Sequence, residues 1–444
     1  MLVRTVARLS AIGQQVANRL PNMFDSAFQD GVRRPGTLEM TVMLAALMAL
    51  NSLAIDAMVP ALPNIGRSLH VGHENRQQLV VIAYFVGFGS TQLVWGPLAD
   101  RFGRKPILAA GVILYSGFAL LCGIAWSFDV LIAARLCQGA SAAVTRVLVI
   151  AMVRDLFEAE EMARVMSLVS MVFMVMPVLA PNLGQLILMI GSWRAIFLVL
   201  AGYGILMLVW SSTRLPETLH PEYRRSLHVV EIGRAIQATM TDPLSRGYTL
   251  ALTVSSGCLI AYISSIQQIV ADAFHEGRYI GLVFAAVAAP MALASWTNSR
   301  VVGRFGLRRV GHLAAAAFAL IAVAHMALAF AGGETLGSFI VLQALTMCCF
   351  AFTSANLSTL AMTNMAAIAG TASSVQGIIW TIGGAAIGFL IGAEFDGTVL
   401  PFVVGTAACA IIGFIGVVLT EPRRLFASIG PQPQLALADP DDLC

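Results

Sequence analysis

Apolar stretches long enough to cross a lipid bilayer follow one another through most of this 444-residue chain, and they limit its fold more than any other feature. A helix needs about 20 apolar residues to span roughly 30 Å of hydrocarbon. Stretches of about that length cover residues 39–62, 76–98, 107–127, 130–153, 164–190, 194–213, 247–271, 277–299, 310–331, 336–360, 368–393 and 398–420. The sequence therefore predicts an all-α integral membrane protein with twelve transmembrane helices.

The composition supports a membrane protein and argues against other classes. Hydrophobic residues make up 58% of the chain and charged residues 11%, against roughly half and a quarter in soluble domains. The net charge of +3 is spread over the loops rather than gathered into a patch, so we expect no nucleic-acid partner. All but one of the seven cysteines lie in apolar segments. We interpret them as packing residues without a disulfide framework.

The motifs of ATP hydrolysis and of metal-dependent catalysis are absent from the sequence. The only lysine, Lys105, precedes Pro106, so there is no Gly-Lys-Ser/Thr phosphate-binding loop. His73 and Glu74 lack the second histidine of a zinc-protease helix. His325 lies inside a predicted span with no acid near it in the sequence, and we expect it to be a packed or hydrogen-bonded core residue. We expect no catalytic residues, no metal, no cofactor and no enzymatic activity; a membrane enzyme or a non-transporting sensor is the alternative from another class.

The distribution of basic residues predicts the orientation in the membrane. Cytoplasmic loops of membrane proteins carry an excess of lysine and arginine. With the N-terminus inside, only four of the 27 basic residues fall outside, namely Arg67, Arg76, Arg194 and Arg278. The sequence therefore predicts that both termini lie in the cytoplasm.

A long charged loop divides the predicted helices into two sets of six. We expect a cytoplasmic tail at 1–37, a first bundle at 38–213, a cytoplasmic linker at 214–246, a second bundle at 247–420 and a disordered cytoplasmic tail at 421–444. Arginines and apolar residues at near-helical spacing in 1–37 favour a tail with a surface-lying amphipathic helix, and an organelle transit peptide is the alternative.

A short internal repeat relates the two sets of helices. The string Arg101-Phe102-Gly103-x-Lys105 recurs as Arg304-Phe305-Gly306-x-Arg308, each time after the second helix of its set. Gly303 stands in the copy where Asp100 stands in the first string. The sequence thus predicts two pseudo-symmetric halves with loops that need not act alike.

Ionisable side chains inside the predicted spans are candidates for function, because a charge in hydrocarbon costs several kcal/mol. Three qualify: Asp56, Arg135 and Arg146. Asp56 and Arg135 lie at comparable depth and can pair, and Arg146 follows Arg135 by about three helical turns, on the same face and about 16 Å away. The alternatives are an Asp56 that lies in the headgroup zone and an Arg146 that pairs with backbone carbonyls or a neighbouring loop.

Residues 96–106 form a charged turn between two predicted spans, and this turn resembles the signature loop between the second and third helices of the major facilitator superfamily. Its matching residues are Gly96, Asp100, Arg101, Gly103, Arg104 and Lys105. The resemblance implies that Asp155, at the end of the fourth span, pairs with Arg104 or Arg101 and locks an inner gate. A solvated surface pair worth under about 1 kcal/mol is the alternative.

Two further motifs resemble those of proton-coupled antiporters in this superfamily. Around Arg135 the residues Gln138 and Gly139 match the fourth-helix motif, in which the arginine takes part in proton transfer. Pro177, Pro181 and Gly184 resemble the antiporter motif of the fifth helix, although Ala180 and Gln185 stand where glycines are common. Strings at 56–63, 193–197, 215–219 and 369–374 are similar to the bicyclomycin and chloramphenicol resistance branch.

The resemblance implies a major facilitator fold and export of small amphipathic compounds in exchange for protons, by alternating access. Asp56 would carry the coupling alone, because Met48 occupies the place of a second acid found in some relatives. It further implies a multi-pass protein of the bacterial inner membrane that acts as a monomer in the lipid bilayer. A proton symporter or an exporter of one metabolite is the alternative. Polar residues that can line the cavity are Tyr262, Gln267, Gln268, Asn356, Gln376 and Trp380.

Overall fold

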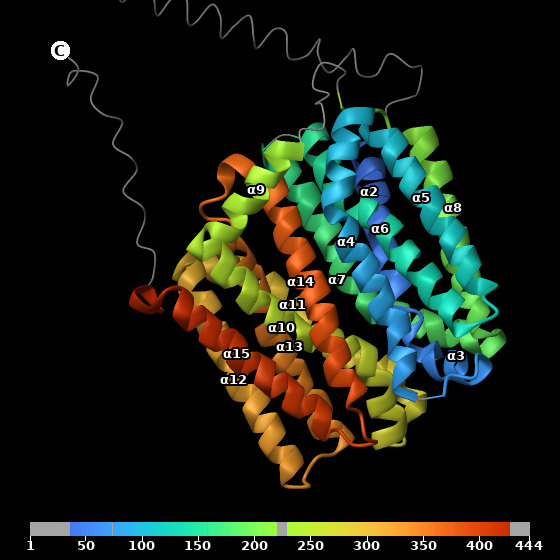
Figure 1. The fold of residues 1–444 in the computed structure, drawn as a ribbon, viewed down its shortest axis with the longest axis vertical. Helices are drawn as coiled ribbons and strands as arrows, with labels where there is room; N and C mark the ends of the chain where they lie inside the picture. Colours follow the sequence, from blue (N-terminus) through green and yellow to red (C-terminus); the bar gives the residue numbers. More distant parts are fainter. Residues whose placement is uncertain (1–35, 73, 158, 220–228, 427–444) are drawn as a thin grey trace, which may run out of the picture.

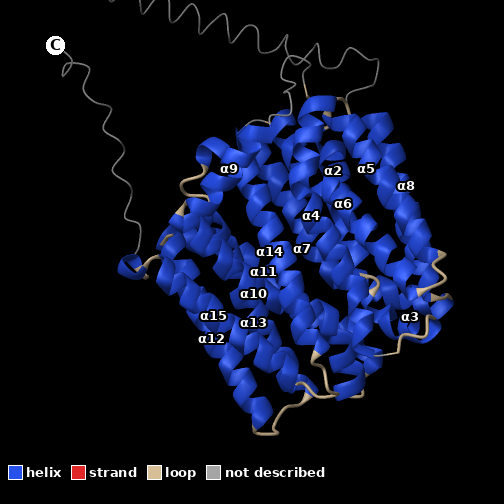
Figure 2. Ribbon diagram, in the orientation of Figure 1, coloured by secondary structure: helices blue, strands red, loops and turns tan. Residues whose placement is uncertain are grey.

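The computed structural model describes residues 36–426 except 73, 158 and 220–228, and within them the regular structure is entirely helical (Figures 1 and 2). The long helices are α2 (Thr37–Asp56), α4 (Leu79–Phe102), α5 (Arg104–Gly123), α6 (Phe128–Leu156), α7 (Ala159–Ile190), α8 (Trp193–Arg214), α10 (Pro243–Gln268), α11 (Ile280–Phe305), α12 (Leu307–Phe330), α13 (Leu336–Ala361), α14 (Ala369–Ala393) and α15 (Leu400–Thr420). The expected helix in the tail at 1–37 and most of the tail at 421–444 lie outside the described residues.

These helices confirm the predicted succession of membrane spans. Among the described residues, 11 helical segments are long and apolar enough to cross a bilayer. α7 runs for 32 residues, and its described apolar part is Val175–Ile190. The first predicted span differs at its end, because α2 stops at Asp56. The chain then continues through a short 3-10 turn, η1 (Val59–Ala61), into α3 (Leu62–Ser68), each with a proline in its first turn.

The helices form two groups that lie side by side (Figure 1). α2 to α8 make the first half and α10 to α15 the second, while α9 (Val229–Thr241) lies in the linker between them. The halves meet along α4 with α14 and along α7 with α11. We call the end of the molecule that carries α9 the linker end, and the end that carries α3 the far end.

The charged segment at 96–106 differs from the expected turn. α4 continues through Pro97 to Phe102, and α5 begins at Arg104, so the only non-helical residue between them is Gly103. Gly103 has φ 104°, a left-handed conformation that side chains with a Cβ rarely adopt. Pro106 fits inside α5 because it lies in the first turn, where a backbone N–H has no helical partner.

The internal repeat is confirmed by the backbone. Gly306 joins α11 to α12 with φ 83° and ψ 151°, while Gly103 has φ 104° and the same ψ. A glutamate from the end of each half binds next to this turn. Glu217 accepts hydrogen bonds from the backbone N–H groups of Arg104 and Lys105, at 2.9 and 3.3 Å, and Glu421 pairs with Arg308 at 2.7 Å. The loss of the acid at Gly303 has therefore left the fold of the turn unchanged.

Candidate functional site

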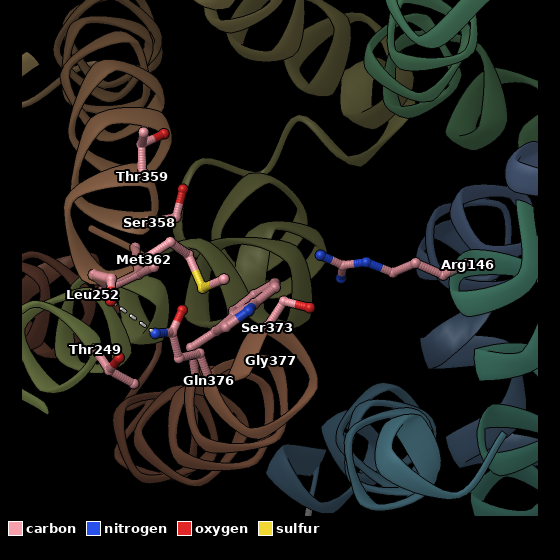
Figure 3. A pocket seen from close by; sticks show the side chains of 11 residues that line it. Arg146, Thr249, Leu252, Ser358, Thr359, Met362, Ser373, Gln376 and Gly377 are labelled. Atoms are coloured by element: carbon pink, nitrogen blue, oxygen red, sulfur yellow. Dashed lines mark hydrogen bonds between the residues drawn. The ribbon is translucent and has the colours of Figure 1, made fainter. Parts of the chain in front are cut away.

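A cavity of about 380 Å³ lies between the two halves toward the linker end. The first half contributes Arg146 of α6, and the second half contributes residues of α10, α13 and α14 (Figure 3). The remaining lining residues are Thr249, Leu252, Ser358, Thr359, Ala361, Met362, Ser373, Gln376, Gly377 and Trp380. Thr359 and Ser373 are exposed, and they lie near the ends of α13 and α14 that adjoin the linker end. The cavity therefore opens toward the linker end.

Arg146 points from α6 across this cavity toward the second half (Figure 3). Its guanidinium carbon lies 5.5 Å from the ring centroid of Trp380 and 5.9 Å from that of Phe88. Within the described residues it forms no hydrogen bond and no ion pair. Neither backbone carbonyls nor a loop satisfy this arginine, so its five N–H donors remain available to the cavity.

Asp56 is the last residue of α2 and only 3% of it is exposed. Among the described residues no hydrogen bond or ion pair reaches its carboxyl group. The segment that follows it, η1, packs against α10 of the second half. Tyr262 of α10 is buried, and its hydroxyl has no hydrogen-bond partner. Asp56 is therefore buried close to the boundary between the halves.

Arg135 is fully buried inside the first half. Its guanidinium donates to the carbonyl of Val80 at 3.0 Å and to Oε1 of Gln138 at 2.9 Å, and it lies 4.5 Å from the ring centroid of Tyr84. Within the described part of the chain it makes no ion pair with Asp56 in this conformation. The ring of Tyr84 faces Arg135, and its hydroxyl donates to Asn51 of α2 at 3.2 Å.

Glycines of the two helix motifs allow the close helix packing that surrounds Asp56 and Arg135. A Cβ placed on Gly139 would collide with the backbone of Tyr84, so Gly139 brings α6 against α4. A Cβ on Gly184 would collide with the carbonyl of Ala57, the residue that follows Asp56. α7 contains both Pro177 and Pro181 and remains one helix through them. The fifth-helix motif thus packs directly against the backbone next to the buried acid.

A set of polar contacts closes the space between the halves at the far end. Gln78, which precedes α4, donates to Oε1 of Gln268 at 2.5 Å and to the carbonyl of Gly392 at 3.0 Å. Asn75 donates to the carbonyls of Ala393 and Phe395 at 2.8 and 2.9 Å. We call these residues, Asn75, Gln78, Gln268, Gly392, Ala393 and Phe395, the far-end closure. Because the cavity opens at the linker end, it is accessible from one end of the molecule and closed from the other.

The inner-gate residues gather at the linker end of the first half. Nε of Arg104 lies 3.0 Å from the Asp155 carboxylate, and Nη1 lies 2.9 Å from Asp100. The predicted pairing of Asp155 with Arg104 is thus confirmed, whereas Arg101 is exposed and stacks on Phe102. Arg104 and Asp155 are 12% and 22% exposed, so the pair is partly buried. A Cβ on Gly96 would make only an ordinary contact, so close approach does not require that glycine.

The polar residues expected to line the cavity separate into three places. Gln376 and Trp380 line it, Gln268 belongs to the far-end closure, and Asn356 donates to Asn298 inside the second half at 2.8 Å. Sequence reasoning missed Asn75, which directly precedes the predicted span at 76–98, and Gln78, which lies at the start of that span; neither belongs to a motif. It also missed the acid that meets His325: Glu334 lies nine residues away and contacts its ring at 2.6 Å.

The comparisons with known proteins agree with this architecture. Residues 44–388 match the model of the Major Facilitator Superfamily. The chain is 30% identical to a bicyclomycin resistance protein homolog of Haemophilus influenzae over 86% of this chain and 96% of that protein. It is 27% identical to the multidrug resistance protein MdtL of Klebsiella pneumoniae over 86% of this chain and 95% of that protein.

A solved structure shares the fold at low sequence identity. The crystal structure of a D-xylose-proton symporter superposes with a TM-score of 0.70 and 11% identity, covering 86% of this chain and 97% of the other. The spans, the repeated turns and these matches together place this multi-pass membrane protein in a family of transporters. The chain belongs to the major facilitator superfamily.

Proposed function

We propose that this protein exports small amphipathic compounds in exchange for protons. The observation that carries the proposal is the pairing of a one-sided cavity between two halves with a buried, unpartnered carboxyl group at their boundary. Proton-coupled transport by alternating access requires both features: a site that opens to one side at a time and a group that gains and loses a proton. The names of the relatives, which denote drug resistance, support export of drugs.

In this mechanism the present conformation faces the cytoplasm. The linker end carries the basic residues that the orientation rule assigns to the cytoplasm, so the cavity receives a compound from inside. Rocking of the halves would break the far-end closure and open the same cavity outward. The loop at 96–105 would then close the inner side. Arg104 and Asp155 already pair within the first half while the cavity is open at that end, so their contact would hold the loop in shape rather than form the closure.

Asp56 would exchange a proton for the compound. The Asp56 carboxyl group is buried in this conformation, and opening toward either side would admit water and allow the proton to be exchanged. Arg135 and Tyr84 would transmit the change to α4 and α6, because Tyr84 contacts the Arg135 guanidinium and donates to Asn51 on α2, the helix that carries Asp56.

We further propose a bacterial inner membrane as the location, with both termini in the cytoplasm and a monomer as the working unit. The relatives are bacterial proteins, and Arg146 and Trp380, which face each other across the cavity, belong to the two halves of one chain.

Proton movement in inverted membrane vesicles tests the proposal. Vesicles acidified by respiration are followed with a pH-sensitive dye while phenicols, bicyclomycin-like compounds, organic cations and sugars are added in turn. We expect at least one amphipathic compound to release protons from vesicles that contain the protein and not from vesicles without it. Silence across the panel, together with proton-dependent uptake of a labelled nutrient into intact cells, would instead establish the symporter.

A further inference from the structure

The cavity carries one full charge, and that charge is positive. Among its lining residues Arg146 is the only ionisable side chain, and the others are apolar, aromatic, hydroxyl or amide groups. Asp56 is not among them. A compound inside the cavity therefore meets a cation without a neighbouring carboxylate in the described part of the lining.

Arg146 is held in place without using its hydrogen-bonding capacity. The rings of Phe88 and Trp380, at 5.9 and 5.5 Å, support the guanidinium from both halves. Neither ring accepts a hydrogen bond from the N–H groups of the guanidinium. These N–H groups lie in one plane and can bind both oxygens of a carboxylate. An arginine that only stabilised the fold would be expected to bond a carbonyl or a carboxylate, as Arg135 and Arg104 do.

The rest of the lining suits an aromatic or otherwise apolar body. Trp380, Met362 and Leu252 offer apolar surface on the second half. Trp380 lies 5.5 Å from the Arg146 guanidinium, and Met362 lies across the cavity from Arg146 (Figure 3). Gln376 donates through Nε2 to Ser245 and Ala361, at 2.9 and 3.1 Å, which leaves its Oε1 as an acceptor toward the cavity. The anionic and the apolar parts of one compound would thus be bound by opposite halves.

From this arrangement we propose that the cavity selects organic anions: amphipathic compounds with an aromatic body and a carboxylate, the carboxylate bound by Arg146 and the body packed on Trp380. The inference rests on the proposed function and narrows its substrate class. Such a compound would also bridge the halves, since Arg146 belongs to the first and Trp380 to the second.

A matched series of ligands tests the proposal by binding alone. 1-Naphthoate, 1-naphthamide and 1-naphthylamine share one ring system and differ in the charge of the attached group. Binding of each to the purified full-length protein in nanodiscs is measured by isothermal titration calorimetry at pH 7.5. We expect naphthoate to bind at least about tenfold more tightly than the amide, because hydrogen bonds to charged groups are stronger than neutral ones.

Variants assign the preference to the cavity. Arg146→Gln should abolish the difference between naphthoate and naphthamide, and Arg146→Lys should keep part of it. Arg154→Gln is the matched control, because it removes the same charge from an exposed position on the same helix. Trp380→Leu should weaken the acid and the amide by similar factors, because both lose the aromatic contact.

Several results would overturn the inference. These are equal or tighter binding of the amide or the amine by the wild type, no binding of naphthoate, or a preference for the acid that survives Arg146→Gln. The proposed function is judged separately: proton-coupled export of neutral or cationic compounds by the same preparation would uphold the transporter and reject the organic-anion site.

Discussion

At the scale of single residues, the three charged side chains within the long helices differ in their surroundings. Arg135 donates to Val80 and Gln138, Arg146 lies against Trp380 at the cavity, and the buried Asp56 has no hydrogen bond or ion pair among the described residues. Hydropathy alone indicates that Asp56, Arg135 and Arg146 lie within spans. It does not indicate that Arg135 turns to Val80 and Gln138 while Arg146 turns to Trp380, because those contacts depend on how α4, α6 and α14 meet. Polar groups inside membrane helices have several available partners, and the sequence does not rank them.

Gly184 offers a test of the packing around the buried acid. Gly184→Ala should destabilise the protein by about 1–3 kcal/mol and reduce transport, because its Cβ would collide with the backbone of Ala57 beside Asp56. Thermal unfolding in detergent and transport in vesicles are the measurements. Gly202→Ala on α8 is the control, since a Cβ there meets nothing within 4 Å. Equal stability of the two variants would reject the proposed close approach.

At the scale of elements, the predicted spans agree with the helices to within several residues, since the thickness of the bilayer fixes their length. The largest departures occur where local chemistry takes over. Pro60 and Pro63 begin new short helical segments after α2. The charged residues at 96–106 suggested a long turn between two spans, but Gly103 alone forms it. The contacts of the far-end closure were not predictable, because Gln78 and Gln268 are separated by 190 residues.

Glu217 tests the repeated turn. Glu217→Gln should lower stability by about 1 kcal/mol, because a carboxylate at the N-terminus of α5 accepts the N–H groups of Arg104 and Lys105 and an amide accepts them more weakly. Thermal unfolding is the measurement. Glu161→Gln, on the first turns of α7 and exposed, is the control. An unchanged unfolding temperature for Glu217→Gln would show that the contact contributes nothing measurable.

The far-end closure can be tested by weakening it. Gln78→Ala removes hydrogen bonds to Gln268 and Gly392, each worth about 0.5–1.5 kcal/mol net, so the population open at the far end should rise several-fold. Spin labels are attached to cysteines that replace the exposed Arg67 and Glu394, in a background without native cysteines. Double electron–electron resonance between them reports the distance between the halves. Gln237→Ala in α9 is the control. A distance distribution unchanged by Gln78→Ala would mean that other contacts hold that end closed.

At the scale of the whole molecule, two similar halves enclose one cavity, and their differences give each a separate task. The first half contains the buried acid and both intramembrane arginines, while the second half supplies most of the cavity wall. The repeat was readable because its turn needs glycine at Gly103 and Gly306. The different contributions of the two halves could not be predicted from the sequence, because they depend on which residues face the boundary between the halves.

The most direct test of the central claim is accumulation of an exported compound in proteoliposomes under an imposed pH gradient. A gradient of one unit stores about 1.4 kcal/mol per proton, enough for a concentration ratio of about ten. We predict that the wild type and Asp129→Asn, an exposed acid at the start of α6, accumulate the compound against its gradient. Asp56→Asn should lose this accumulation and keep exchange of the compound down its gradient. Proton-driven accumulation by Asp56→Asn at the wild-type level would contradict the account.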